Sequence, residues 1–160
     1  MVVNGMRIGL DAYTIREFEL DAFGMLDWAA EMGFEGVQYE DITKLTPQRD
    51  AGYLRELAAD VKRRGMFAYV TVQRPNPYLF EGSAAQLCDA FRRDIELCAE
   101  NGWTQVRANV GQYVHRVDYC IPYGEQLRAT GEFLKQMRPV LRDCGVCVNL
   151  ETHADATSYE

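Results

Sequence analysis

The residues best suited to chemistry lie in the run 146–153, which reads as a short strand followed by polar residues. Because side chains alternate along a strand, the polar residues of this run share one face and the apolar residues share the other. The polar set is Cys147, Asn149 and Glu151, and the apolar set, expected to pack on helices, is Val146, Val148 and Leu150. A carboxylate such as Glu151 can bind a hard divalent cation or act as a general base. A surface glutamate at a strand end is the alternative.

Polar residues also end four earlier segments that resemble strands. They are Asp11 and Tyr13, then Gln38, Glu40 and Asp41, then Gln73 and Arg74, then Arg107 and Asn109, before Asn149, Glu151 and His153 at the last. Ligands in parallel α/β folds bind at the carboxyl ends of the strands, so these residues predict a hydrophilic pocket. An isolated histidine such as His153 is more often a simple hydrogen-bonding residue than a ligand. A tyrosine such as Tyr13 suits either sugar stacking or rim packing.

Strands and helices alternate along the chain to position these groups. Strands are predicted over 6–11, 36–41, 66–72, 103–109 and 146–153, and the segment 12–19 is predicted as a loop. Four helices lie between them and end at Gly33, Gly65, Gly102 and Gly145. Their start signals are Asp21, the pair Thr46–Pro47, and Ser83 with Gln86 three residues later.

Each predicted helix carries an apolar stripe that is expected to be buried. The stripes are Phe23, Leu26 and Ala30; Leu54, Leu57, Ala58 and Val61; Leu87, Phe91, Ile95 and Cys98; and Leu127, Leu134, Met137 and Leu141. Strands that alternate with such helices predict one α/β domain over 1–160, built on a parallel sheet. No glycine-rich phosphate loop follows the first strand, which argues against a dinucleotide-binding fold.

Composition and net charge limit the kinds of molecule that the chain is expected to bind. The chain has 160 residues, 48% hydrophobic and 26% charged, which is ordinary for a globular domain. A net charge of -7 argues against a nucleic-acid partner, because phosphate binding needs Lys and Arg. No apolar run is long enough to span a membrane and no signal peptide is recognisable, so a cytoplasmic location is expected. Five cysteines without a signal peptide indicate free thiols, and the CxxC at 144–147 is interpreted as structural rather than redox or metal-binding.

The sequence resembles the xylose isomerase-like TIM barrels, the sugar phosphate isomerase/epimerase superfamily. The segments that carry the resemblance are 9–13, 32–38, 106–109 and 150–158. It implies a (β/α)8 barrel of which this chain supplies about five parallel strands and four helices, as an N-terminal portion.

The resemblance also implies a function. It predicts a divalent metal (Mn, Mg, Co or Zn) and the abstraction of a proton from a sugar or sugar phosphate through an enediolate. Glu151 matches the fifth-strand glutamate that ligates the metal and moves a proton, and His153 matches a nearby position that orients substrate or metal. Further substrate contacts are expected from Tyr13, Gln38, Glu40 and Asn109. Gln38 stands where many members carry glutamate, so Glu40, two residues on and on the same face, is a candidate substitute.

Several alternatives stay open at this stage. The aspartate, histidine and glutamate ligands usual on strands six to eight have no counterparts, so the 160-residue chain is expected to be inactive alone. An inosose dehydratase-like lyase fits the same framework. An endonuclease IV-like nuclease fits poorly, because the chain has two histidines and a negative net charge. A non-catalytic chain that associates through open sheet edges, with a second copy or with a missing C-terminal half, is the competing class.

Overall fold

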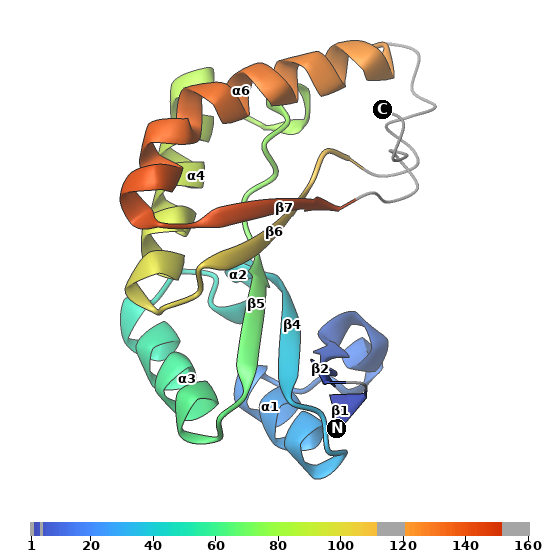
Figure 1. Cartoon of the computed structure of the whole chain (residues 1–160). Coiled ribbons are helices and arrows are strands. Elements are labelled where there is room, and N and C mark those ends of the chain that lie inside the picture. The colour runs from blue at the N-terminus through green and yellow to red at the C-terminus, as the bar shows by residue number, and fades with distance from the viewer. Residues whose placement is uncertain (1, 4, 112–120, 152–160) are drawn as a thin grey trace. The chain divides into compact units, whose positions relative to one another are not determined.

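The computed structural model describes residues 2–3, 5–111 and 121–151 of the chain (Figure 1). The chain divides into two compact units. The first unit comprises Met1–Thr71 with Glu100–Trp103, and the second comprises Val72–Ala99 with Thr104–Glu160.

The first unit is built on three parallel strands in the order β3-β4-β5. Their bounds are Leu10–Asp11, Gly36–Asp41 and Phe67–Thr71, and a hairpin of β1 (Val2–Val3) and β2 (Met6–Arg7) precedes them. The helices are η1 (Ala12–Phe18, a 3-10 helix), α1 (Ala22–Glu31), α2 (Ile42–Leu45) and α3 (Ala51–Arg63). Apolar side chains from α1, α3 and the central strand close the core, and Leu26, Val37, Leu54 and Leu57 are each 0% exposed.

The second unit pairs β6 (Gln105–Asn109) with β7 (Cys147–Glu151) in parallel (Figure 1). Its helices are η2 (Pro77–Leu79), α4 (Ala84–Glu100) and α6 (Tyr123–Cys144). The rings of Phe91 on α4 and Phe133 on α6 meet edge to face at 5.3 Å, which joins the two long helices. Val72 donates its N–H to the carbonyl of Arg107 at 2.9 Å, so the chain entering this unit is hydrogen-bonded to β6.

These elements confirm the α/β class with parallel strands and four principal helices. Two predicted helix signals are present in detail. Ser83 N–H donates to Gln86 Oε1 at 2.8 Å and Gln86 N–H donates to Ser83 Oγ at 3.2 Å, which is the predicted capping box of α4. Gly145 ends α6 in the left-handed region with φ 64°, as predicted.

The prediction of a single first strand over 6–11 is wrong. Residues 6–7 pair in the antiparallel hairpin and only Leu10–Asp11 joins the parallel sheet. Arg7 accounts for the break, because its guanidinium donates to the carbonyl oxygens of Glu35 and Gly65 at 3.0 and 2.6 Å. Those bonds hold residue 7 to Glu35 and Gly65 by its side chain, while its backbone pairs with Val2 and does not join the parallel sheet.

Two further boundaries differ from the prediction. The segment 12–18 is a 3-10 helix rather than a loop, because Asp11 caps it by accepting the N–H of Tyr13. Helix α3 starts four residues later than predicted. Asp50 is its N-cap, accepting from the N–H groups of Gly52 and Tyr53, whereas Thr46 ends the short helix α2.

The buried faces of two helices are rotated by one residue from the prediction. In α1 the buried residues are Ala22, Leu26 and Ala29, and Ala30 is exposed. In α6 they are Gln126, Thr130, Phe133 and Met137, whereas the predicted Leu127, Leu134 and Leu141 are only half-buried. The stripes of α3 and α4 agree with the prediction at Leu54, Leu57 and Val61 and at Leu87, Phe91, Ile95 and Cys98.

The apolar side of the last strand is also more open than predicted. Val146 is buried and Val148 is half-buried, but Leu150 is 45% exposed. Helix packing therefore covers only the amino-terminal part of this face among the described residues.

Candidate functional site

In the first unit, the strand ends bring Asp11 and Gln38 together. These residues are register partners of β3 and β4. Gln38 Nε2 donates to Asp11 Oδ2 at 3.2 Å, and Asp11 Oδ1 accepts the N–H of Tyr13 at 3.0 Å. One carboxylate thus caps η1 and orients the amide of Gln38.

The amide of Gln38 faces a cavity of about 340 Å³. The cavity is lined by Gly9, Leu10, Asp11, Gln38, Phe67 and Tyr69. Phe67 and Tyr69 lie with ring centroids 5.2 Å apart, and Tyr69 is 41% exposed. A carboxylate and an amide beside one exposed and one half-buried aromatic ring suit a polyhydroxylated ligand, which has both hydroxyl groups and an apolar C–H face. Tyr69 was missed by the sequence analysis, although alternation within β5 separates Phe67 and Tyr69 from the buried Ala68 and Val70.

Tyr13 lies apart from this cavity. Its side chain is 54% exposed, and the guanidinium of Arg16 lies 4.0 Å from its ring centroid. The cation–π contact turns the ring toward its own helix η1. The side chain of Tyr13 therefore does not join the side chains of Asp11 and Gln38 at this cavity.

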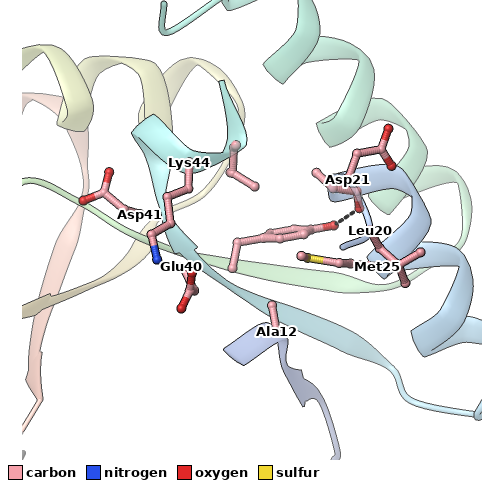
Figure 2. Close-up of a pocket in the computed structure, with 10 residues that line it drawn as sticks. Ala12, Leu20, Asp21, Met25, Glu40, Asp41 and Lys44 are labelled. Carbon is pink, nitrogen blue, oxygen red and sulfur yellow. Dashed lines mark hydrogen bonds and ion pairs between the residues drawn. The ribbon is translucent and has the colours of Figure 1, made fainter. Parts of the chain in front are cut away.

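Glu40 lines a different cavity from Gln38, of about 110 Å³. The pairing of β4 with β5 shifts register between Tyr39 and Asp41, next to Glu40. Glu40 Oε2 lies 2.5 Å from Lys44 Nζ, one turn along. Figure 2 shows Leu20, Asp21 and Met25 across this cavity from Glu40 and Lys44, and Asp41 pointing away from it.

In the second unit, β6 and β7 present a continuous polar face, here called the polar ladder. Its members are Gln105, Arg107 and Asn109 of β6, and Cys147, Asn149 and Glu151 of β7. Asn109 and Glu151 are register partners, so the structure brings these two predicted site residues together. Lower in the ladder, Asn149 Nδ2 donates to Gln105 Oε1 at 3.0 Å.

Glu151 forms an ion pair that the sequence analysis did not predict. Arg107 Nη1 lies 3.2 Å from Glu151 Oε2, and the two side chains are 22% and 30% exposed. Glu151 Oε2 is buried, yet within the described part of the chain no donor reaches it with hydrogen-bond geometry. A buried carboxylate oxygen without a hydrogen bond is an available acceptor or ligand atom.

Hydrogen bonds of the buried side chains of Asp94, Asn76 and Gln126 fix the segments that follow β5 and β6. Asp94 of α4, 0% exposed, accepts the N–H of Gln73 at 2.8 Å. Asn76, also 0% exposed, donates from Nδ2 to the carbonyl of Val110 and to Gln126 Oε1, both at 3.0 Å. Gln126 Nε2 in turn donates to the carbonyl of Ile121 at 3.0 Å. The amide of Asn76, the N-cap of η2, therefore anchors Val110, and the amide of Gln126 on α6 anchors Ile121.

The other residues named from the sequence lie outside the described residues. They are His153, and Gln112, Tyr113, His115 and Tyr119 of the segment 112–120. Their predicted roles stay predictions.

The described cysteines fit the structural interpretation of the thiols. Cys88, Cys98, Cys144 and Cys147 are free. Burial, with a smaller contribution from Asp94, raises the pKa of Cys98 to about 12, and burial also raises the pKa of Cys144. A raised pKa keeps a thiol protonated and therefore weakly nucleophilic.

The described residues offer a divalent cation only part of a set of ligand atoms. Among residues 2–3, 5–111 and 121–151, no three side chains of His, Cys, Asp or Glu gather closely enough to hold a metal ion. The buried oxygen of Glu151 is one suitable ligand atom, and its neighbour is a guanidinium rather than a second carboxylate. The described residues therefore do not fit a complete metal centre.

Comparison with known proteins shows the fold. No family model matches the sequence, and no curated protein matches it. A D-tagatose 3-epimerase-like protein aligns over 92% of this chain and 53% of its own, with 18% identity and a TM-score of 0.60. An IOLI protein with a bound zinc atom aligns over 91% and 51%, with 15% identity and a TM-score of 0.70. A D-psicose 3-epimerase crystallised in the presence of D-fructose aligns over 89% and 51%, with 14% identity and a TM-score of 0.66.

These structures are xylose isomerase-like TIM barrels, so the resemblance seen in the sequence is confirmed at the level of fold. The chain spans about half the length of each, which agrees with a partial barrel. None of the helices that the structure describes is long and apolar enough to cross a membrane.

Proposed function

We propose that the chain contributes the first strand ends of a sugar isomerase or epimerase site, in which Glu151 transfers a proton. The observation that carries this proposal is the buried, non-hydrogen-bonded Oε2 of Glu151 at the carboxyl end of β7, beside Asn109. The likeness of fold to proteins described as sugar epimerases supports the choice of substrate class.

The proposed reaction requires Glu151 to act as a general base. Its carboxylate removes a proton from the carbon next to a sugar carbonyl, and the electron pair of the broken C–H bond moves into an enediolate. Return of a proton to the opposite face of that carbon gives the epimer, and transfer to the neighbouring carbon gives the isomer. Asn109, the register partner of Glu151, would donate a hydrogen bond to a substrate oxygen. Within the first unit, the cavity beside Asp11 and Gln38 is a separate candidate for binding a sugar or sugar phosphate.

A divalent cation (Mn, Mg, Co or Zn) enters the proposal through the family resemblance alone. Such a cation would supply electrostatic stabilisation of negative charge on the substrate oxygens. Glu151 would contribute one oxygen ligand, and the other ligands would lie outside the described residues. The assignment of 1–160 to a single domain and the cytoplasmic location likewise stay predictions.

Solvent exchange tests proton abstraction by Glu151 alone, the first half of the reaction, and does not require the complete turnover that the 160-residue chain is expected to lack. The chain is incubated in D₂O with a panel of ketoses and aldoses, with and without MnCl₂, and deuterium at the carbon next to the carbonyl is measured by NMR. We expect deuterium incorporation that Glu151→Gln abolishes, because an amide cannot accept the proton. Glu56→Gln, at an exposed position of α3, is the matched control and should leave the exchange unchanged.

Exchange that survives Glu151→Gln, or no exchange with any sugar, would contradict the proposal. A product that has lost one water would instead support the lyase alternative.

A further inference from the structure

We propose that Arg107 is a second catalytic residue beside Glu151, whose guanidinium binds the substrate oxygen that becomes negatively charged when Glu151 removes the proton. The inference rests on the proposed function, because it assigns a partner to the base that the proposed function names. The juxtaposition that carries it is a guanidinium 3.2 Å from the buried oxygen of Glu151, which accepts no hydrogen bond from the described residues.

The strands hold both groups on one face of the sheet. Arg107 of β6 pairs in register with Asn149 of β7, and Glu151 lies two residues further along β7 on the same face. The carbonyl of Arg107 accepts the N–H of Val72 at 2.9 Å, so the backbone of residue 107 is also held on its other edge. The guanidinium therefore contacts Glu151 from a fixed backbone position, as a preorganised catalytic group must.

The contact leaves the carboxylate able to act as a base. Arg107 Nη1 lies 3.2 Å from Glu151 Oε2, but no N–H of the described residues donates to this oxygen with hydrogen-bond geometry. A lone pair of Oε2 therefore stays available for the proton that is taken from carbon. A guanidinium that donated squarely to Oε2 would instead compete with that proton.

The same guanidinium can serve the substrate during proton transfer. As the C–H bond breaks, its proton goes to Glu151 Oε2 and its electron pair forms the C=C bond of the enediolate, while the π pair of the carbonyl group moves onto the carbonyl oxygen. That oxygen is only two bonds from the carbon that loses the proton, so a sugar whose C–H group faces Oε2 presents it close to a cation 3.2 Å from Oε2. Arginine has five N–H donors and does not lose its proton under ordinary conditions, so Arg107 can contact Glu151 and donate to the oxyanion together.

A purely structural ion pair predicts something different. If Arg107 only holds β6 to β7, its replacement lowers the free energy of unfolding and leaves the affinity for anions unchanged. If Arg107 binds the oxyanion, anion affinity falls when the charge at residue 107 is removed and rises when the charge at residue 151 is removed. Anion binding therefore separates the two roles.

Glycolate is the probe, because its carboxylate and neighbouring hydroxyl group mimic the charge and the adjacent oxygens of an enediolate, and glycolamide is its uncharged counterpart. Binding to the 160-residue chain is measured by NMR titration with EDTA present, so that trace metal ions cannot take up the probe. We expect Arg107→Gln and Arg107→Met to weaken glycolate binding about fivefold and Glu151→Gln to tighten it about fivefold, since each change removes one partly exposed charge interaction. Arg107→Lys, which keeps the charge, should retain most of the affinity, and glycolamide should bind every variant alike.

The deuterium-exchange assay gives a second readout. Arg107→Gln is expected to slow exchange about a hundredfold, the usual loss for one oxyanion donor. Arg93→Gln, at an exposed position of α4, is the matched control for net charge and should change neither glycolate binding nor exchange. Three substitutions at residue 107 are used so that one folded variant suffices, with folding checked by circular dichroism.

Glycolate affinity that is unchanged in Arg107→Gln and Arg107→Met, an equal loss in Arg93→Gln, or no detectable glycolate binding by the wild type and Glu151→Gln would overturn the inference. These outcomes differ from failure of the proposed function. If Glu151→Gln abolishes exchange while glycolate binding does not depend on Arg107, the proposed function stands and the role of Arg107 falls. If no exchange is found while glycolate binding follows the charges at residues 107 and 151, proton transfer by Glu151 falls and Arg107 keeps its anion-binding role.

Discussion

The lack of a side chain at Gly36 leaves room for the ring of Phe67, which lines the cavity of the first unit. Gly36 is buried in β4, and a Cβ atom built on it would lie 2.4 Å from the ring of Phe67. The guanidinium of Arg7 covers the same ring, 5.0 Å from its centroid. Phe67 therefore rests against backbone on one side and a cation on the other, which fixes the aromatic part of the cavity.

Gly36→Ala is expected to destabilise the chain by about 1–3 kcal/mol, because the half-buried ring of Phe67 has to move to admit the new methyl group. Urea unfolding followed by circular dichroism measures the change. Gly131→Ala is the matched control: its Cβ would meet nothing within 4 Å on α6, and alanine should stabilise that helix by about 0.5–1 kcal/mol. Equal effects of the two substitutions would show that the Phe67 contact does not constrain the unit.

Residue types alone identified part of the candidate site. Glu151 and Asn109 were found because alternation and strand ends are visible in a sequence, and register then placed them opposite each other. Arg107 was named as a strand-end residue, but its pairing with Glu151 depends on which strands are neighbours, which no local pattern encodes. Alternation predicts Glu40 on the face of Gln38, but it does not show that the two residues line different cavities, which depends on the surrounding segments.

Helix ends were more predictable than helix faces, because an end is set by local groups. Ser83 and Gln86 satisfy each other's backbone N–H within one turn of α4. Asp21 likewise accepts the N–H of Gly24 at 2.7 Å at the start of α1. Such signals need no knowledge of distant residues.

Removing the capping box of α4 tests how much this local signal contributes. Ser83→Ala is expected to lower the free energy of unfolding by about 1 kcal/mol, since it leaves a helix N–H without its acceptor. The double variant with Gln86→Ala should cost less than the sum of the two single changes, because the two bonds form one motif. Gln136→Ala, at an exposed position of α6, provides the control in the same urea titration. A loss at Ser83 no larger than that at Gln136 would contradict the role of the cap.

The face of α6 was not predictable because polar residues occupy part of it. Leucines at 127, 134 and 141 repeat every seven residues and suggest a stripe, yet Gln126 and Thr130 are each 2% exposed. Gln126 turns inward because Asn76, fifty residues earlier, supplies a buried partner for its amide. Burial of a polar residue is thus decided by a distant hydrogen bond, and hydrophobicity scales do not record that.

At the scale of the whole molecule, the unpaired strand edges point to self-association. Among the described residues, β3 hydrogen-bonds only to β4 in the first unit, and β7 only to β6 in the second. Open edges carry unpaired N–H and C=O groups that can pair with another chain. Leu150 on β7, 45% exposed, adds apolar surface beside one such edge.

Sedimentation velocity over a range of concentrations is expected to show a concentration-dependent shift above the mass of one chain. Leu150→Lys should reduce the shift, because a charge on an edge strand opposes pairing. Met32→Lys, which adds the same charge at a residue that is 53% exposed after α1, should leave it unchanged. A single monomeric species at every concentration would refute self-association.

Asn76 and Gln126 hold the carbonyls of Val110 and Ile121 from outside the segment that those two residues bracket. The anchoring groups are two side chains and two backbone oxygens, so the fixation does not depend on the identity of any residue in between. The sequence between Val110 and Ile121 can therefore change during evolution while the strand before it and the helix after it keep their places.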